Sequence, residues 1–458
     1  MAGLSLLVFL LAAGGALAVG TGALTQPAGT AGCISEDGSG PCADGHAMGG
    51  PGGVAVSPDG KNVYTASGYG VARFDRTLST GAITQPSGAA GCISSWSEPC
   101  RDGHAVTSSS GVAVSPDGKS VYVASHGYPT NTSAVVRLKR NTSNGAISQP
   151  AGAAGCISDD GSGPCADGHA IGAPQDLAVS PDGKNVYVAS APAGSPGAVL
   201  TLNRDTSTGA ITQPAGTAGC ISADGSGGEC ADAHGIGTVQ NNVAVSPDGK
   251  SVYVASFGGG IVRFDRDRST GALTQPAGAA GCISDDGSGP CADGHAIGSP
   301  TALAVSPDGK SVYVGTRISS STPPGDEIAA LVRLKRNTNT GAITQPTGTA
   351  GCISADGSGP CADGHGMLRG PYGVTVSPDG RSVYLTAASA NALVRIRRNT
   401  TYGSISQPAG TAGCISEDGS GPCSDGRGLS FPTDVAVSPD GNSVYVAASA
   451  LARFNRAP

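Results

Sequence analysis

The sequence predicts an all-β fold, a seven-bladed β-propeller of four-stranded antiparallel blades. Three observations predict it. A glycine-rich stretch typified by residues 145–172, GAISQPAGAAGCISDDGSGPCADGHAIG, occurs in seven copies between residues 22 and 428, and we call each copy a cassette. A second motif, typified by GVAVSPDGKSVYVAS at residues 111–125, also occurs seven times, at spacings of 58 to 71 residues. Finally, the repeats start and stop out of phase, as expected when the two chain ends share one blade.

The second motif predicts the first two strands of each blade. Short β-branched runs, V-A-V and V-Y-V-A, flank the tetrad S-P-D-G, in which Pro presets φ, Asp caps its own backbone and Gly takes the left-handed position. Each copy therefore predicts a hairpin. The tetrads start at Ser57, Ser115, Ser180, Ser246, Ser306, Ser377 and Ser438.

A third and a fourth strand follow each hairpin. Residues 134–140, AVVRLKR, predict the third strand, and residues 145–149, GAISQ, predict the fourth after an N-T-S-x-G turn. The chain opens with an isolated fourth strand at residues 22–26 and closes after a third strand at residues 450–456. We therefore expect the N-terminal strand to complete the last blade, which removes the open edge of the ring.

The first 20 residues form an uncharged apolar run that ends in Ala16, Leu17 and Ala18. Such a run is typical of a secretory signal peptide with a small-residue cleavage site. No Lys or Arg precedes it, however, and it is long enough to stay as a membrane anchor. We expect a signal peptide at residues 1–20, with an uncleaved anchor as the alternative, and a propeller over residues 21–458. The protein is then secreted or held at the cell surface, and contacts a membrane only if the leader is kept.

All 14 cysteines lie in the cassettes as seven local pairs, each with seven to nine intervening residues. An even count inside loops rich in Gly, Ser and Pro predicts one short disulfide per repeat and an oxidising compartment. Zinc coordination is the alternative, but structural zinc sites favour closer pairs and need four ligands together. The predicted disulfides are Cys33–Cys42, Cys92–Cys100, Cys156–Cys165, Cys220–Cys230, Cys282–Cys291, Cys352–Cys361 and Cys414–Cys423.

The run P-x-G-V-A-V-S-P-D-G-K-x-V-Y-V, followed by a strand and T-G-A-I-T, resembles the repeat of the lactonase-like, YVTN-type seven-bladed propellers. That group includes relatives of 6-phosphogluconolactonase and carboxymuconate cyclase. The resemblance covers essentially the whole chain after residue 21 and implies the seven-bladed fold. Lactone hydrolysis follows only as an expectation, because these motifs specify the blade and not the activity. The disulfide loop also departs from the short connection usual in that family.

The cassettes concentrate negative charge. From each first cysteine through the D-G-H or D-G-R step they hold 19 of the chain's 34 acidic residues, and Arg101 and Arg427 are their only basic residues. Their net charge is therefore −17, whereas the rest of the chain carries +10. We expect the cassettes to share one face of the propeller. An acidic face repels nucleic acid and anionic lipid, attracts divalent cations or basic partners, and favours stacking on the basic face of a second disc.

The acidic loops are candidates for Ca²⁺ binding, because carboxylates and turn carbonyls are hard oxygen ligands. The alternative is that Asp, Gly and Ser simply form the turns that a disulfide loop needs, and the spacing matches no EF-hand loop. No other cofactor is expected. The candidate ligands are Asp159, Asp160, Asp167, Asp285, Asp286 and Asp293.

The D-G-H step places one histidine in six of the seven cassettes, and Arg427 takes the seventh place. A ring of imidazoles near the channel suggests titration or metal binding. We expect instead that each histidine hydrogen-bonds its own loop, because equivalent positions around a wide ring are too far apart to converge.

Catalytic candidates lie where the repeats differ, although sequence drift produces such differences too. Glu98, His126 and Arg317 would suit lactone opening, with the carboxylate or imidazole activating water and the guanidinium stabilising the oxyanion. No G-x-S-x-G elbow, H-E-x-x-H or P-loop is present. The other departures are Trp96, Arg101, Tyr128, Asp326, Glu327, Arg369 and Tyr372.

Three N-x-S/T sequons, at Asn131, Asn141 and Asn399, are candidate glycosylation sites if the chain is exported. The evenness of the repeats favours an exported, disulfide-stabilised propeller that acts as a binding or structural module through its acidic face. The alternative is a lactonase-type hydrolase.

Overall fold

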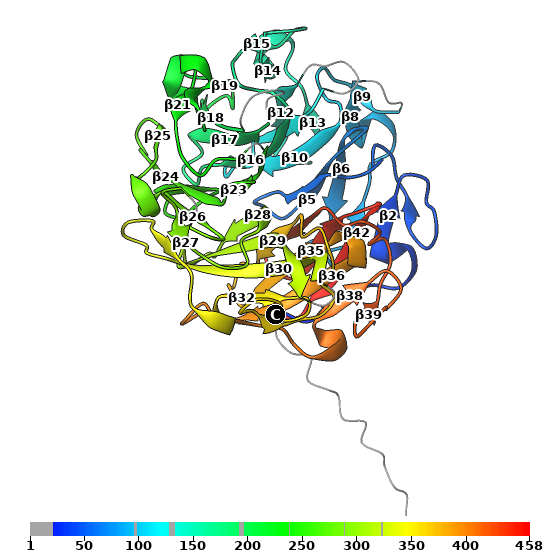
Figure 1. Cartoon of the computed structure of the whole chain (residues 1–458). Coiled ribbons are helices and arrows are strands. Elements are labelled where there is room, and N and C mark those ends of the chain that lie inside the picture. The colour runs from blue at the N-terminus through cyan, green and yellow to red at the C-terminus, as the bar shows by residue number, and fades with distance from the viewer. Residues whose placement is uncertain are drawn as a thin grey trace, which may run out of the picture.

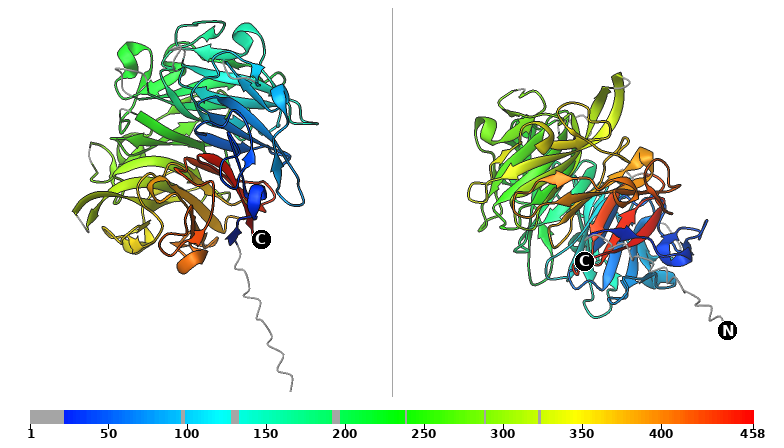
Figure 2. Two further views of the ribbon diagram at one scale, coloured as in Figure 1. Left: turned by 90° about the vertical axis from the view of Figure 1, so that its right-hand side faces the viewer. Right: turned by 90° about the horizontal axis from the view of Figure 1, so that it is seen from below.

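The structure, a computed structural model, describes residues 22–95, 99–127, 133–191, 197–237, 239–287, 289–321 and 324–458. It confirms the predicted seven-bladed β-propeller, in which seven sheets surround one axis (Figure 1) and form a disc (Figure 2). The predicted leader at residues 1–20 and the sequon at Asn131 lie outside the described residues. None of the described helices has the length and apolar character needed to span a bilayer.

Three antiparallel strands form the body of each blade, as the hairpin motif predicts. In the second blade Val112 of the inner strand pairs with Val123, and Val123 pairs with Val136 of the third strand. The inner strands are β4 (Gly53–Val56), β10 (Ser109–Val114), β16 (Pro174–Val179), β22 (Val239–Val245), β28 (Ser299–Val305), β34 (Val374–Val376) and β40 (Asp434–Val437). The second strands are β5 (Asn62–Ser67), β11 (Ser120–Ser125), β17 (Asn185–Ser190), β23 (Ser251–Phe257), β29 (Ser311–Ser321), β35 (Ser382–Ala387) and β41 (Ser443–Ala447). The third strands are β6 (Gly70–Arg76), β12 (Ala134–Arg140), β18 (Ala198–Arg204), β24 (Ile261–Arg266), β30 (Pro324–Arg336), β36 (Ala392–Arg398) and β42 (Ala450–Arg456).

The fourth strand position is divided between two short strands, where a single strand at residues 145–149 was expected. In the second blade, β13 pairs with the C-terminal end of β12, and β14 pairs with its N-terminal half. The first pieces are β1 (Leu24–Thr25), β7 (Ile83–Thr84), β13 (Ile147–Ser148), β19 (Ile211–Thr212), β25 (Leu273–Thr274), β31 (Ile343–Thr344) and β37 (Ile405–Ser406). The second pieces are β2 (Cys33–Ser35), β8 (Cys92–Ser94), β14 (Cys156–Ser158), β20 (Cys220–Ser222), β26 (Cys282–Ser284), β32 (Cys352–Ser354) and β38 (Cys414–Ser416).

Short 3₁₀ turns join the two pieces, and each starts at a Gly in the left-handed conformation, such as Gly152 (φ 59°). These turns are η1 (Gly29–Gly32), η2 (Gly88–Ala90), η3 (Gly152–Ala154), η4 (Gly216–Ala218), η6 (Gly278–Ala280), η7 (Gly348–Ala350) and η9 (Gly410–Ala412). Two further turns of this kind, η5 (Gly225–Gly228) and η8 (Ala388–Ala390), lie in the fourth cassette and after β35.

An additional strand forms the outer edge of every blade. It pairs in parallel with the second piece, as Ser158 does with Asp167, so each blade is mixed rather than purely antiparallel. The cassette is therefore more than a connector, because it supplies the outer part of the sheet. The outermost strands are β3 (Ala43–Asp44), β9 (Arg101–Asp102), β15 (Ala166–Asp167), β21 (Ala231–Asp232), β27 (Ala292–Asp293), β33 (Ala362–Asp363) and β39 (Ser424–Asp425).

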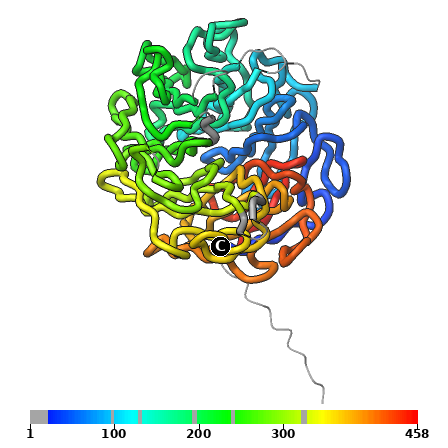
Figure 3. The backbone as a smooth tube through the Cα atoms, in the orientation of Figure 1, coloured from blue at the N-terminus to red at the C-terminus, as the bar shows by residue number. Residues whose placement is uncertain are grey.

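The two ends of the chain meet in one blade, as predicted from the phase of the repeats. Leu24 pairs with Arg456, and Cys33 pairs with Ala452 of the same C-terminal strand. Figure 3 shows the start and the end of the propeller side by side. The hydrogen bonds between them close the ring, so no blade is left with an open edge there.

All seven predicted disulfides are present, and no cysteine is free among the described residues. Cys156 lies in β14 and Cys165 directly precedes β15, with their Cα atoms 4.8 Å apart. The bond therefore joins the ends of the loop between the two outer strands. A two-residue strand holds few backbone hydrogen bonds, so we infer that the disulfide fixes it against the sheet.

A repeated three-residue clasp links neighbouring blades. Arg140, the last residue of β12, donates from Nε to Tyr64 Oη (2.8 Å) and from Nη2 to both carboxylate oxygens of Asp59 (2.9 and 3.0 Å). Tyr64 in turn donates to the Gly145 carbonyl (2.7 Å). The corresponding Arg–Asp pairs are Arg76–Asp440, Arg204–Asp117, Arg266–Asp182, Arg336–Asp248, Arg398–Asp308 and Arg456–Asp379.

The aspartate of S-P-D-G thus serves both its turn and the clasp. Asp59 Oδ1 accepts hydrogen bonds from Ser57 Oγ (2.6 Å) and Lys61 N (3.1 Å), and Gly60 takes the left-handed conformation that the turn requires (φ 70°). Partial burial raises the pKa of Asp59, but the hydrogen bond from Ser57 and the Arg140 guanidinium outweigh it and lower the pKa below its usual value. The carboxylate is therefore charged at neutral pH.

A second tie joins each cassette to the next. His104 N donates to Gln149 Oε1 (2.7 Å), and Gln149 Nε2 donates back to the His104 carbonyl (2.9 Å). Gln26 and Arg427 make the same exchange where the ring closes. The imidazole Nε2 atoms of His169, His234 and His365 also lie 3.2–3.3 Å from a carbonyl of the next cassette, which differs from our expectation that each histidine would bond its own loop. The other pairs are Gln85–His46, Gln213–His169, Gln275–His234, Gln345–His295 and Gln407–His365.

Candidate functional site: a pocket on the propeller axis

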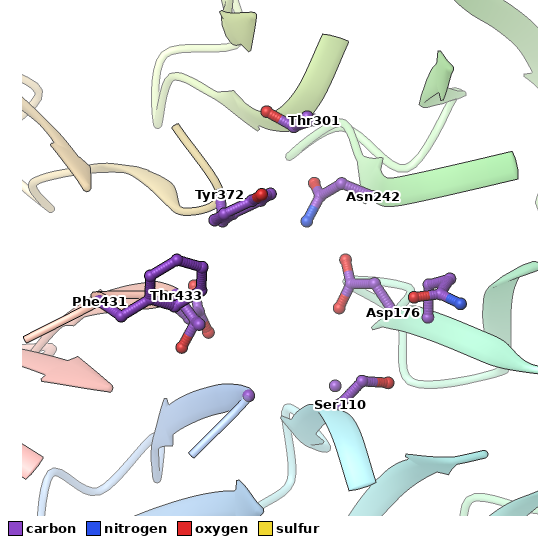
Figure 4. Close-up of a pocket in the computed structure, with 11 residues that line it drawn as sticks. Ser110, Asp176, Asn242, Thr301, Tyr372, Phe431 and Thr433 are labelled. Atoms are coloured by element: carbon purple, nitrogen blue, oxygen red, sulfur yellow. The ribbon is translucent and has the colours of Figure 1, made fainter. Parts of the chain in front are cut away.

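A pocket of about 300 Å³ lies where the inner strands of the seven blades meet. Every blade contributes to its wall, and Figure 4 shows the side chains pointing toward a common open space. The lining residues are Gly52, Ser110, Gly111, Gln175, Asp176, Asn242, Thr301, Tyr372, Phe431, Thr433 and Asp434.

The residue directly before each V-A-V-like run decides how polar the pocket is. In the second, third, fourth and fifth blades the register shifts just before this run, and such bulges redirect side chains. Asp176, Asn242 and Asp434 occupy this position in three blades, and the other blades have Gly or Ala there. A Cβ at Gly111 would lie 2.9 Å from Asp176 Cα, so the backbones of adjacent blades approach too closely there for a side chain.

The three polar side chains also hold the adjacent blade. Asp434 Oδ2 accepts from Val54 N (2.8 Å), Asp176 Oδ2 from Val243 N (3.3 Å) and Asn242 Oδ1 from Leu303 N (3.2 Å). Each contact joins the inner strands of consecutive blades. These polar groups therefore have a structural role besides lining the pocket.

The two carboxyls in the pocket have unusual acidities. Burial raises the pKa of Asp176 to about 6. Burial raises the pKa of Asp434 to about 7, and the negative charge of Asp176 contributes to this increase. Their hydrogen bonds from backbone N–H groups oppose the shifts without cancelling them. Near neutral pH each of the two carboxyls is therefore partly protonated and partly ionised.

These pKa values predict that stability falls as the pH rises from about 4 to 7. A carboxyl whose pKa is higher in the folded protein than in the unfolded chain, 3.8 for Asp, binds its proton more tightly when folded. The contribution of this carboxyl to the free energy of unfolding is complete at low pH. It is lost as the pH rises through the pKa of the folded protein. Replacing Asp434 by Asn should remove about 2 kcal/mol of the stability difference between pH 5 and pH 8, measured by urea denaturation.

The comparison between wild type and the Asp434→Asn variant isolates this effect from other groups. Burial lowers the pKa of His104 and His126, which reduces stability on acidification below pH 6.5 in both proteins alike. Equal pH dependence in the two proteins would contradict the raised pKa of Asp434.

An aromatic pair stands at the pocket. Tyr372 is 38% exposed and Phe431 is 57% exposed, and their ring centroids are 6.0 Å apart with a 42° angle between the planes. Figure 4 places both rings across the open space from Asp176. The two rings therefore give the pocket an apolar side opposite Asp176.

The catalytic candidates from the sequence do not share one pocket. His126 is half-buried, and its Nε2 atom lies 3.2 Å from Ser110 Oγ at the axial pocket. Arg317 instead lines a separate pocket of about 360 Å³, where its Nη1 atom lies 3.4 Å from Glu327 Oε2 and its guanidinium is 5.4 Å from the centroid of the Phe257 ring. Glu98, Trp96 and Tyr128 lie outside the described residues, as does the side chain of Asp326.

Three of the calcium candidates accept hydrogen bonds from backbone N–H groups of their own cassettes. Asp159 Oδ1 accepts from Ile171 N (2.7 Å), Asp160 Oδ1 from Ser162 N (2.9 Å) and Asp285 Oδ1 from Ile297 N (2.7 Å). Asp167, Asp286 and Asp293 are exposed. Within the described ranges, no three His, Cys, Asp or Glu side chains are arranged to hold a metal ion. Calcium binding stays a prediction.

The two described sequons lie on the turn that follows the third strand. Asn141 and Asn399 are exposed, and the Oδ1 atom of each accepts a hydrogen bond from the backbone two residues on (2.9 Å in both). Their Nδ2 atoms, which would carry a glycan, are on the side chain of an exposed turn. Whether they are modified stays a prediction.

The cassettes lie at the periphery of the disc, where Figure 1 labels β9, β15, β21, β27 and β39. Of their 19 acidic residues, 16 are exposed, Glu36 and Glu417 are half-buried, and Glu98 is outside the described residues. The last residue of the outermost strand is an exposed Asp in every blade. In each blade the second piece of the divided fourth strand pairs near the start of the third strand, away from the S-P-D-G turn.

No family model matches the chain, and no curated protein matches it in sequence. Among solved structures, the hydrazine synthase of Kuenenia stuttgartiensis is similar over 90% of this chain and 97% of its own, with a TM-score of 0.54 and 17% identity. A putative 6-phosphogluconolactonase from Bacteroides uniformis is similar over 78% of this chain and 83% of its own (TM-score 0.47, 17% identity). Another from Bacteroides fragilis covers 78% and 82% (TM-score 0.47, 16% identity). Structures described as lactonases are thus among those that resemble this chain, and at these identities the likeness shows the fold alone.

Proposed function

We propose that this propeller is an exported binding module that recognises basic partners through an acidic face formed by its cassettes. One observation carries the proposal: the outermost strand of every blade ends in an exposed Asp, at seven equivalent places around the disc. A single exposed carboxylate gains little from pairing with a cation. Seven sets of carboxylates on one body sum to a field that concentrates positively charged partners.

The disulfides support this proposal, because they anchor the loops that carry the carboxylates. Asp160 lies inside the loop that the Cys156–Cys165 bond closes, and Asp167 lies two residues after Cys165 in the outermost strand β15. Loops held in this way lose little conformational entropy on binding, which favours affinity. Disulfides of this number also favour an oxidising compartment outside the cytosol.

Removing the carboxylates from the outer strands should weaken binding to cations. We expect Asp102→Asn, Asp167→Asn and Asp232→Asn together to lower the affinity for a fluorescent oligolysine peptide at least tenfold at low ionic strength, measured by anisotropy. Salt should abolish most of the difference, because exposed charges are screened.

A control variant removes two carboxylates at another turn, against three in the cassette variant. Asp205 and Asp267 are exposed on the turn that follows the third strand, where other repeats have Asn141, Asn337 and Asn399. Asp205→Asn with Asp267→Asn is therefore compatible with the turn and should leave peptide affinity within about twofold. An equal loss in control and cassette variants would assign the effect to net charge and contradict a role for the cassettes.

A second copy of this protein is one possible basic partner, so the same proposal includes self-assembly of the discs. Exposed basic residues such as Lys119 and Lys139 lie at the S-P-D-G end of the blade, at the opposite end of the third strand from the disulfide loops, so a basic face of one disc would meet the acidic face of another. Such a heterologous contact generates open stacks. Scattering at low salt should show particles that grow with protein concentration, and monomers at every salt concentration would exclude stacking without affecting the binding of other cations.

A second candidate, lactone hydrolysis, is favoured by the contact between His126 and Ser110 at the axial pocket. Burial lowers the pKa of His126, so its imidazole is neutral at pH 7 and able to accept a proton from water. His126→Gln should then abolish turnover of a test lactone, whereas Arg317→Gln, in the other pocket, should not. Absence of lactone turnover by the wild-type protein would exclude this candidate.

A further inference from the structure

The axial pocket combines two carboxyls, an aromatic pair and several neutral polar groups, and none of the described residues that line it is Lys or Arg. We propose that this pocket binds a single organic cation, an alkylammonium or alkylguanidinium group. The cation comes either as a free amine or as the Lys or Arg side chain of a partner. In the second case the inference rests on the proposed function, because that partner would dock on the acidic face.

The carboxyls supply the charge complement. Asp176 and Asp434 come from blades three and seven and line the same pocket, and the charge of Asp176 contributes to the raised pKa of Asp434. Figure 4 shows the Asp176 carboxylate directed into the open space. An ionised carboxylate has about four acceptor positions, and the backbone contacts described above occupy only some of them. The pocket therefore holds two carboxyls that keep acceptor capacity for a donor on the ligand.

The aromatic pair suits the same ligand. A cation within about 6 Å of an aromatic ring is attracted by the negative face of the ring, and the attraction grows where water is excluded. Tyr372 and Phe431 also offer apolar surface to the alkyl part of the ligand. A pocket of about 300 Å³ is at the small end of the range for ligand sites and so fits one side chain or small amine rather than a polymer.

The surroundings disfavour an anionic ligand. The titratable groups that face the site are the carboxyls of Asp176 and Asp434 and the Tyr372 hydroxyl, with the His126 imidazole behind Ser110. Burial keeps His126 neutral at pH 7, so it supplies no positive charge. A phosphorylated or carboxylated sugar would meet two carboxyls without a compensating cation.

Binding should be coupled to proton release. The empty pocket holds protons on its carboxyls near neutral pH, and a cation stabilises the ionised forms and displaces those protons. Affinity should therefore rise about tenfold between pH 5.5 and pH 7.5, while the ligand itself stays fully charged.

The test uses the full chain and two ligands of nearly equal shape, butylguanidinium and neutral butylurea, followed by calorimetry and by NMR. We expect butylguanidinium to bind at least tenfold more tightly than butylurea. Asp176→Asn should reduce its affinity about tenfold and weaken the pH dependence. Tyr372→Leu should reduce it about threefold without changing the pH dependence, because both carboxyls stay in place.

Asp176→Asn is a tolerable change, because Asn242 already occupies the equivalent position in the next blade and makes the same inter-blade hydrogen bond. The reverse change, Asn242→Asp, adds a third carboxyl and should raise affinity. Equal binding of butylurea, or unchanged butylguanidinium binding in Asp176→Asn, would overturn the proposal.

An oligoarginine peptide separates the two sources of the cation. If the pocket holds a partner's side chain, Asp176→Asn weakens peptide binding as well as butylguanidinium binding. If it holds only free amines, peptide binding is unchanged and butylguanidinium binding is lost. A wrong assignment of the acidic face gives a different result. The cassette variants would then bind the peptide normally, while the pocket would still bind butylguanidinium.

Discussion

Complete reduction of the seven disulfides is expected to lower the melting temperature by roughly 10–20 °C. Each bond closes a loop with a sequence separation of 8 to 10 residues. In the chain-entropy model a loop of this size contributes about 2.5–3 kcal/mol by restricting the unfolded chain. In a chain of this length, that free energy corresponds to about 3 °C in melting temperature for one bond. If the seven bonds act independently, their combined effect approaches the upper limit of the expected range.

Calorimetry of the native and the fully reduced protein measures this effect, with thiol titration to confirm that reduction is complete. The double variant Cys156→Ser with Cys165→Ser tests one bond and should lose about 3 °C. The loops are so similar in length that pairs at different places should differ by only a few tenths of a kcal/mol. An unchanged melting temperature after full reduction would show that the outer strands hold without their bonds.

The fold was predictable because its signals are repeated seven times. The S-P-D-G turns and the β-branched runs agree in every copy, and the phase of the repeats predicts that residues 22–26 meet residues 450–456. The division of the fourth strand was not predictable, because the run C-I-S is too short to give a period. Its pairing with the third strand depends on the 3₁₀ turn at Gly152–Ala154, which is a tertiary arrangement.

The candidate site was only partly predictable from the sequence. Tyr372 stood out as a departure from the repeat, but Asp176, Asp434 and Phe431 were missed. A signal was present: the position before each V-A-V-like run is Asp or Asn in three repeats and Gly or Ala in the other four. Recognising it requires knowing that this position faces the axis. Repetition also hid the inter-blade contacts, because Arg140 and Asp59 are 81 residues apart and each has a local explanation in its own turn.

Loss of one inter-blade clasp is the second large effect that we expect. The Arg140→Met variant should be destabilised by about 3 kcal/mol in urea denaturation, since breaking a buried ion pair leaves its remaining members without their partner. The Arg140 side chain is 1% exposed and that of Asp59 is 30% exposed, so water replaces the lost contact only in part. Tyr64 also loses a donor to its hydroxyl, although it keeps its own bond to Gly145.

The neighbouring residue provides the control, because Lys139 lies on the same strand, carries the same charge and is exposed. Lys139→Met should change stability by no more than about 0.5 kcal/mol. The difference in stability between the two variants measures the effect of the clasp. Both variants lose one positive charge and place Met in the same strand, so these two effects cancel in the comparison. Because the clasp spans two blades, its loss should also let one junction open before the rest, so hydrogen exchange at Gly145 and Tyr64 should accelerate more than at distant blades. Equal destabilisation by the two variants would mean that the blades are held by their apolar surfaces alone and that the sevenfold repeat of Arg, Tyr and Asp serves only the individual turns.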